Sequence, residues 1–148
     1  MKRIIETTLR RMNKVRKGMY KPEAVTLLCM IAAHESLAGK FRRQIGSGLA
    51  LGLYQIEPET HDSIWDNSDT IHEVAAALGI ERNAHRLEKD DFYSTFVARH
   101  YLAMDVNKLP KDIESMAEYC KSYWNRTGKA TPSKYMDDYL IWLKKNPE

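Results

Sequence analysis

Glu35 is the residue of this sequence whose position best suits acid–base chemistry. Apolar periodicity predicts a helix over residues 22–36, on which Glu35 continues a stripe formed by Leu28 and Ile31. Partial burial and the negative end of the helix dipole both disfavour the ionised carboxylate, so we expect a raised pKa. A carboxyl that keeps its proton near neutral pH can protonate the leaving oxygen of a glycosidic bond. Taken alone, the pattern also fits a surface glutamate at a fraying helix end.

His34 and Glu35 invite comparison with the zinc-protease motif, in which two histidines four residues apart bind the metal. The second histidine would stand at position 38, which is Ala38. The other histidines form no such pair and have no cysteine pair nearby, so we expect no metal and no cofactor. Cys29 and Cys120 fall within amphipathic helical patterns, which favours two buried thiols over a disulfide.

A run of small residues follows the predicted helix of the acid. Within residues 39–55, Gly46, Gly48 and Gly52 stand among short apolar pairs, which predicts turns and a small hairpin or irregular β region. Glycines let the backbone approach a sugar closely, and the amide of Gln55 can bond hydroxyl or N-acetyl groups. Glycine-rich turns often serve only to change the direction of the chain. They suggest the wall of a substrate cleft only when a catalytic acid lies beside them.

Together, these segments resemble the lysozyme-like superfamily, and within it the soluble lytic transglycosylases, goose-type lysozymes and related phage endolysins. Those families place a Glu-Ser pair at a helix end, then Gly-Leu-Met-Gln, then Pro-x-Thr at the start of the next helix. The matching residues are Glu35, Ser36, Gly52, Leu53, Gln55, Pro58 and Thr60, with Tyr54 in the methionine position. The resemblance implies an all-α (α+β lysozyme-like) helical bundle in which Glu35 is the catalytic acid.

The resemblance also suggests residues that contact the substrate. The families carry a later Ala-Tyr-Asn-Ala-Gly segment whose tyrosine lies near the acid, and Tyr119 matches that tyrosine without the asparagine and glycine. Tyr135, in Pro-Ser-Lys-Tyr, resembles a later Pro-x-x-Tyr element. The residues that the resemblance implies for substrate binding are Ser36, Gly52, Tyr54, Gln55 and Tyr119.

The implied substrate is the glycan strand of bacterial peptidoglycan, cut between N-acetylmuramic acid and N-acetylglucosamine. An inverting hydrolase needs a second carboxylate to activate water, whereas a lytic transglycosylase uses the sugar's own 6-hydroxyl and one glutamate. Glu57, Glu59 and Asp62 are near the motif, but the first two flank Pro58, where acidic residues commonly start a helix. The Gly-Leu-x-Gln element favours a lytic transglycosylase, with an inverting muramidase as the alternative.

Periodicity places these residues on a mainly helical chain. The expected helices cover residues 1–17, 22–36, 70–78, 89–104, 112–124 and 132–145, with a short one after Pro58. A chain of 148 residues can bury one core but not two, which predicts a single catalytic domain over residues 1–148.

Positive charge is concentrated in the first helix. Residues 1–17 hold seven lysines and arginines and one glutamate, whereas the whole chain has a net charge of +3, so the remainder is net acidic. This basic amphipathic helix could hold the protein on anionic wall polymers or lipopolysaccharide, or could simply be a solvated face. A nucleic-acid-binding module is a less favoured alternative because the rest of the chain is acidic, so no nucleic-acid partner is expected.

No apolar run reaches the roughly 18 residues that span a bilayer, and the first residues lack the apolar stretch of a secretory signal. We therefore expect no Sec signal and no membrane anchor. The resemblance then suggests a phage protein that passes from host cytoplasm to periplasm or cell wall, or a virion-associated one. A wall-binding protein without catalysis is a further alternative, which the intact Glu35 disfavours.

Overall fold

The computed structural model describes residues 1–43 and 48–147 and confirms a mainly helical chain. Its helices are α1 (Lys2–Val15), α2 (Pro22–Glu35), α3 (Pro58–Asn67), α4 (Ile71–Leu78), α5 (Asp91–Ala103), α6 (Ile113–Tyr119) and α7 (Pro132–Lys145). A 3₁₀ turn, η1 (Ala84–Leu87), precedes α5, and a π-helical turn, η2 (Cys120–Trp124), follows α6. The turn expected at Gly46 lies outside the described residues.

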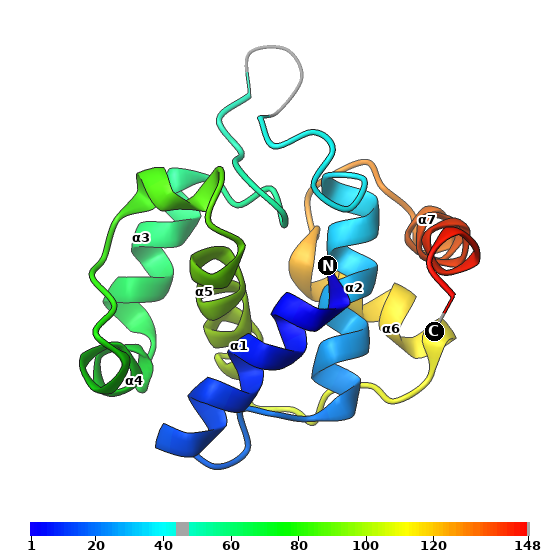
Figure 1. The fold of residues 1–148 in the computed structure, drawn as a ribbon. Helices are drawn as coiled ribbons and strands as arrows, with labels where there is room; N and C mark the ends of the chain where they lie inside the picture. Colours follow the sequence, from blue (N-terminus) through cyan, green and yellow to red (C-terminus); the bar gives the residue numbers. More distant parts are fainter. Residues whose placement is uncertain (44–47, 148) are drawn as a thin grey trace.

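α2 is the central helix of the fold (Figure 1). It packs against α7 and α6 on one side and against α5 on the other, while α1 contacts both α2 and α5. A helix surrounded in this way must be apolar on every face, and nine of its fourteen residues are buried. α2 reaches the surface again at its last turn, where His34 and Glu35 are half-buried.

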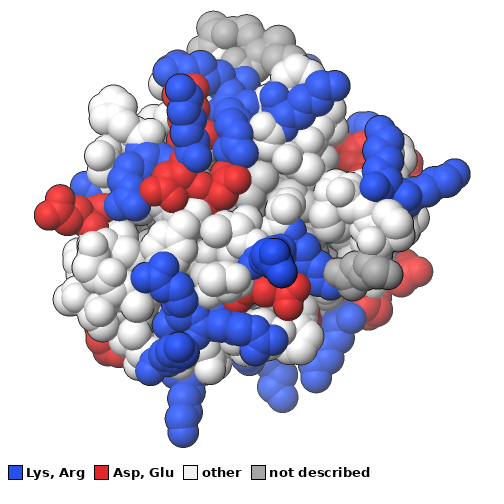
Figure 2. Space-filling model, in the orientation of Figure 1, with Lys and Arg blue, Asp and Glu red and all other residues white. Residues whose placement is uncertain are grey.

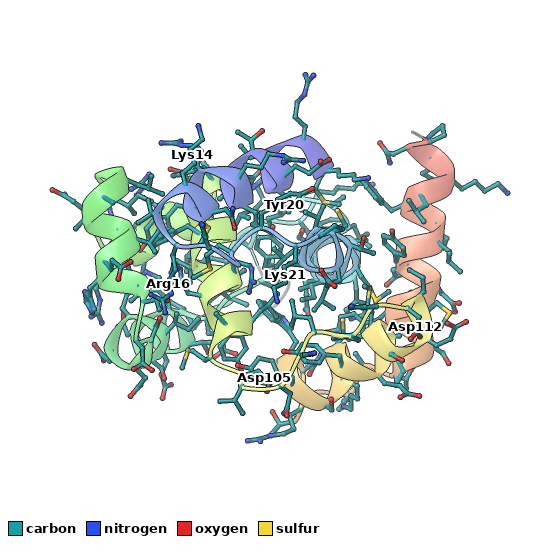
Figure 3. The ribbon with its side chains drawn as sticks, turned by 90° about the horizontal axis from the view of Figure 1, so that it is seen from below. Lys14, Arg16, Tyr20, Lys21, Asp105 and Asp112 are labelled. Carbon is teal, nitrogen blue, oxygen red and sulfur yellow. The ribbon has the colours of Figure 1, made fainter. Side chains whose placement is uncertain are left out.

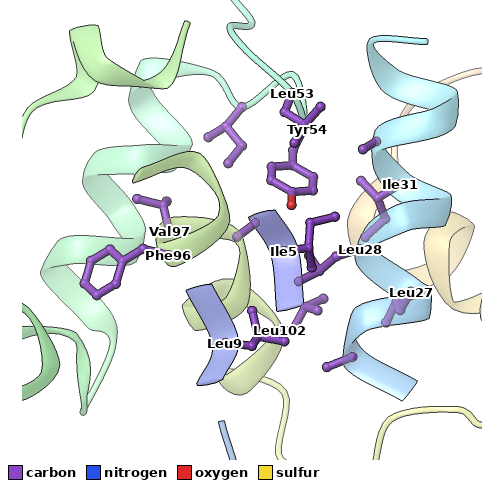
Figure 4. Packing of buried hydrophobic residues seen from close by; sticks show 14 of the residues in the cluster. Ile5, Leu9, Leu27, Leu28, Ile31, Leu53, Tyr54, Phe96, Val97 and Leu102 are labelled. Carbon is purple, nitrogen blue, oxygen red and sulfur yellow. The ribbon is translucent and has the colours of Figure 1, made fainter. Parts of the chain in front are cut away.

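One continuous apolar core joins these helices (Figure 4). Ile5 of α1, Leu28 of α2 and Leu102 of α5 meet there and are at most 1% exposed. Burial of a side chain of this size stabilises the fold by about 1.5–3 kcal/mol. Cys29 and Cys120 are both buried in this core and are not joined by a disulfide, which confirms the prediction that they are two buried thiols.

The segment between α2 and α3 forms the irregular region. α2 ends because Leu37 and Ala38 adopt left-handed conformations, with φ of 49° and 59°, and the Ala38 amide bonds the Ala32 carbonyl at 3.0 Å. Leu51 and Ile56 then exchange backbone hydrogen bonds of 3.0 and 3.1 Å. Within the described residues, strand pairing is limited to isolated bridges of this kind, so the predicted β region is irregular rather than a regular hairpin.

Two local features differ from the prediction. The helix expected over residues 112–124 is α6 followed by η2, in which the Asn125 amide bonds the Cys120 carbonyl at 2.8 Å. η1 was not predicted, and the Asn83 side chain starts it by accepting a hydrogen bond from the His85 amide. π-turns often occur at functional sites, which draws attention to the residues after η2.

α1 is amphipathic, as predicted. Ile5, Leu9 and Met12 are buried, whereas lysine and arginine side chains gather over the exposed face of this helix (Figure 2). Some of this charge is used locally, because the Arg10 guanidinium lies 4.1 Å from the centroid of the Tyr20 ring. None of the helices in the described part of the chain combines the length and apolarity that a bilayer crossing requires.

Candidate active site

A cleft of about 830 Å³ lies beside the end of α2, with Glu35 on its wall. One side of the cleft is formed by the α2–α3 segment and α3, including Gln55 and Glu57. The other side is formed by Tyr101 of α5, Trp124 of η2 and the residues that follow η2. This volume falls within the range of small-molecule sites, and the lining combines aromatic rings with many polar and charged side chains.

The Glu35 carboxyl is held by a single strong donor. The Tyr135 hydroxyl donates a hydrogen bond of 2.5 Å to Glu35 Oε2. Burial raises the pKa of this carboxyl above its usual value, and the hydrogen bond from Tyr135 and the nearby His34 only partly oppose that rise. Among the described residues no hydrogen bond reaches Oε1, which leaves this oxygen to carry the proton. The carboxyl is therefore arranged as a proton donor.

Tyr135 is positioned by neighbours from three segments. It lies in the first turns of α7, which begins where the Thr131 side chain accepts a hydrogen bond from the Lys134 amide. The centroids of the Tyr135 and His34 rings lie 4.0 Å apart, and Asn125 Nδ2 donates to the Tyr135 hydroxyl at 3.3 Å. Burial also raises the pKa of Tyr135, so the phenol stays protonated and keeps donating. The sequence indicated Tyr135 only through Pro-x-x-Tyr, without a role.

A second polar group of α7 holds His34. His34 Nδ1 lies 2.8 Å from Asp138 Oδ2, and Asp138 Oδ1 accepts a 2.8 Å hydrogen bond from Lys134 Nζ. Asp138 and Tyr135 are three residues apart, which places them on one face of the helix. α7 therefore presents a phenol and a carboxylate together to the last turn of α2. Within residues 1–43 and 48–147, no group of three His, Cys, Asp or Glu side chains is arranged to hold a metal ion.

Ser36 and Gly52 support the cleft wall from behind. Ser36 is fully buried, and its hydroxyl donates to the Leu53 carbonyl at 2.6 Å and accepts from the Gly39 amide at 2.8 Å. Gly52 has φ of 80°, and a Cβ there would lie 1.7 Å from the Leu87 carbonyl oxygen. Neither residue is among those that line the cleft, so the structure places both behind its wall, and substrate contact by either stays a prediction.

Of the other three predicted contacts, Gln55 alone lines the cleft. Its Nε2 donates to two backbone carbonyls at 3.0 and 3.2 Å, which leaves the side-chain oxygen as an acceptor. Tyr54 is fully buried and its hydroxyl bonds the Thr95 hydroxyl at 2.8 Å, so it is a core residue. Tyr119 packs against Tyr123 at 5.2 Å and is not among the residues on the cleft wall. Neither Tyr54 nor Tyr119 lines the cleft, and substrate contact by either stays a prediction.

Sequence reasoning missed part of the opposite wall. Tyr101 was not among the residues predicted for the cleft, yet it lines the cleft and meets the Trp124 ring edge-on, with 5.3 Å between the ring centroids. Asn125 and Arg126 also line the cleft, directly after the π-turn. The π-turn inserts one extra residue into the helical repeat and so changes which side chains face the cleft. We find no local sequence signal that predicts this rotation.

Glu57 is the second carboxylate on the cleft wall. It is exposed and precedes the first turn of α3. Glu59 is exposed and is not part of the wall, while Asp62 lies 2.9 Å from His61 and 3.4 Å from Arg82. Those two contacts lower the pKa of Asp62, which suits an ion pair rather than a catalytic base. Of the three acids considered from sequence, Glu57 alone shares the cleft with the candidate acid.

Comparisons with protein-family models, curated proteins and solved structures find no match to this chain. The chemistry of the site is therefore inferred from its geometry. That geometry combines a half-buried carboxyl of raised pKa, a phenol that orients it, and a cleft of about 830 Å³.

Proposed function

We propose that this protein has a lysozyme-like fold and cleaves peptidoglycan glycan strands between N-acetylmuramic acid and N-acetylglucosamine, with Glu35 as the catalytic acid. One observation carries the proposal: Glu35 lies on the wall of an open cleft, with a pKa raised by burial and an orientation set by Tyr135. A general acid for glycoside cleavage needs a retained proton and a fixed direction. The resemblance of the Glu-Ser and Gly-Leu-x-Gln elements supports the substrate class.

The preferred reaction is that of a lytic transglycosylase. Glu35 gives its proton to the glycosidic oxygen as the bond from that oxygen to the anomeric carbon of N-acetylmuramic acid breaks. The resulting carboxylate accepts the proton of the same sugar's 6-hydroxyl while the 6-oxygen bonds the anomeric carbon. The products are a 1,6-anhydro end and a free 4-hydroxyl, and Glu35 is protonated again.

Hydrolysis by an inverting muramidase is the second candidate, and the position of Glu57 favours it. In that reaction Glu35 still protonates the leaving oxygen, while a second carboxylate removes a proton from the attacking water. Glu57 is the carboxylate available for this step among the residues on the cleft wall. It is exposed at the start of α3, where an acidic residue also has an ordinary structural role.

The acid is tested by Glu35→Gln, which keeps the shape of the side chain but removes its proton. We expect the purified variant to lose a factor of about 10²–10⁴ in the rate of clearing isolated cell walls. Glu59→Gln is the matched control, because Glu59 is an exposed glutamate outside the cleft wall, and it should retain the activity of the wild type. Equal clearing by both variants would contradict the proposal and would favour a wall-binding role without catalysis.

The products distinguish the two reactions. Mass spectrometry of digested glycan should show 1,6-anhydro ends, which are about 18 Da lighter than the reducing ends that a hydrolase leaves. Under this mechanism Glu57→Gln should keep most of the cleavage rate. Reducing ends in the digest, together with a loss of about 10² or more in Glu57→Gln, would instead establish the muramidase.

The biological setting follows only as part of this proposal. A small wall-cutting enzyme of this kind suits a phage lysis protein or a virion-associated protein. In either setting its partners are the glycan strands and, through the basic face of α1, anionic polymers of the envelope.

A further inference from the structure

A separate small cavity, of about 220 Å³, lies between the turn from α1 to α2 and the segment that follows α5. Figure 3 looks onto this underside of the molecule, where Arg16, Lys21 and Asp105 are labelled. The charged residues that line the cavity are Arg16, Lys17, Lys21, Arg99 and Lys108, with Asp105 as the single acid. They come from three parts of the chain that only folding brings together.

Arg99 is the buried member of this set. It is 4% exposed, and its Nε and Nη2 donate to the carbonyls of Met19 and Gly18 at 2.8 and 3.1 Å. Both acceptors are neutral, and among the described residues no carboxylate lies within ion-pair distance of Arg99. Burial lowers the pKa of its guanidinium, and Tyr119 and then Glu23 oppose this only through longer-range electrostatic interactions. A buried cation without an ionic partner is costly unless an anion compensates it.

The floor of the cavity is also held in place. Gly18 adopts φ of 97°, and its amide donates to Asn13 Oδ1 at 2.9 Å. The Tyr20 amide donates to the same oxygen at 3.0 Å. Arg99 of α5 bonds the carbonyls of the same turn, so side chains from two helices hold it in place. A preorganised site of this kind loses little entropy when a ligand binds.

We propose that this pocket binds a phosphate group, either as inorganic phosphate or as a phosphate ester in an anionic lipid headgroup. Arg16 and those N–H groups of Arg99 that do not bond the Met19 and Gly18 carbonyls can donate to phosphate oxygens, and the lysines add mobile point charges around them. The cavity is smaller than a typical drug-sized site, which suits one compact anion. It shares no lining residue with the cleft of Glu35, so this binding is independent of the proposed catalysis.

The proposal is tested by titrating the full chain with inorganic phosphate at constant ionic strength, followed by calorimetry. The wild type should bind saturably at one site, and Lys21→Gln and Lys108→Gln should each weaken binding about tenfold. Lys14→Gln is the matched control, because it removes the same exposed charge from α1 outside the pocket, and it should bind as the wild type does. All three substitutions are at exposed positions, so the variants should fold.

Vesicles distinguish the two sources of phosphate. A lipid-headgroup site predicts cosedimentation with phosphatidylglycerol vesicles but not with phosphatidylcholine vesicles. This cosedimentation should be lost in Lys21→Gln and should be displaced by phosphate. Phosphate binding without vesicle binding would assign the pocket to a soluble phosphate. Absence of saturable phosphate binding, or equal weakening in Lys14→Gln, would overturn the proposal, because the charge would then act only as a diffuse field.

Discussion

Glu35 and Tyr135 depend on each other for their charge states. Burial raises the pKa of the Glu35 carboxyl, whereas the hydrogen bond from Tyr135 lowers it by favouring the ionised form. The same carboxyl lies beside the phenol and raises the pKa of Tyr135. One contact of 2.5 Å therefore orients the Glu35 carboxyl and also lowers the pH at which it gives up its proton.

Tyr135→Phe should move the alkaline limb of the pH profile of kcat/KM to higher pH. A general acid works only while protonated, so activity falls as the pH rises through the pKa of Glu35. Loss of the phenol hydroxyl removes an interaction that lowers this pKa, so the activity of the variant should fall at a higher pH. The measurement is the rate of glycan cleavage across pH. Tyr123→Phe is the control, because that hydroxyl donates to the Tyr101 carbonyl at 2.6 Å instead of to the acid.

An unmoved limb in Tyr135→Phe, or one moved to lower pH, would show that the hydrogen bond does not control the acid. A loss of rate at every pH without a shift would assign Tyr135 to orientation alone. These outcomes separate the electrostatic effect of the phenol from its steric effect.

At the scale of elements, the segment before α3 is built around Gly52. Its amide bonds the Arg42 carbonyl at 2.6 Å, and its α-carbon faces the Leu87 carbonyl of η1. Ser94 of α5 donates to that carbonyl at 2.8 Å. The wall that carries Gln55 is therefore packed directly onto η1 and α5, with no room for a side chain between them.

Gly52→Ala should destabilise the protein by about 2–5 kcal/mol, because it combines a left-handed φ with a collision against backbone. Gly79→Ala is the matched control, since Gly79 has φ of 69° but an added Cβ meets nothing within 4 Å. It should cost about 1–2 kcal/mol from the conformation alone. Urea denaturation measures both free energies of unfolding. Equal losses in the two variants would show that the close approach to Leu87 has no energetic effect.

At the scale of the whole molecule, the charge of α1 is spread over an exposed face, while the site chemistry lies at the end of α2 (Figures 1 and 2). Arg10 stacks on Tyr20 and also donates to its hydroxyl at 3.1 Å, so part of its role is structural. Arg3 and Lys14 are exposed, and no hydrogen bond or ion pair holds them in the described part of the chain. Substitution of these two residues therefore tests the long-range attraction of α1 to an anionic surface without disturbing a local contact.

If α1 holds the protein on an anionic wall, pelleting with isolated cell walls should weaken by about tenfold or more between roughly 0.05 and 0.5 M salt, because salt screens exposed charges. Replacing Arg3 and Lys14 by glutamine should weaken pelleting at low salt. The control replaces Lys144 and Lys145 of α7, which are also exposed. Affinity that is independent of salt, or equal losses in both double variants, would leave α1 with a structural role.

The helices and the candidate acid could be predicted from sequence because both depend on local order along the chain. Apolar spacing follows the helical repeat, so helices were predicted within a few residues of α1, α2, α4 and α7. The same spacing indicated that Glu35 continues the buried stripe of α2, where burial raises its pKa. The burial of the two cysteines could be predicted from the same apolar spacing.

Tertiary structure decided which side chains face the cleft. Ser36 and Tyr54 belong to the motif, yet both are turned into the interior, where Leu53 and Thr95 bond them. Tyr135 lies one hundred residues from Glu35 in sequence, and only the packing of α7 on α2 brings its hydroxyl to the acid. Local spacing limits the face that a residue occupies on its own element, but contacts between elements decide what that face meets. The sequence by itself therefore indicated the candidate acid Glu35 and its helix, and packing between helices determined the partner of that carboxyl.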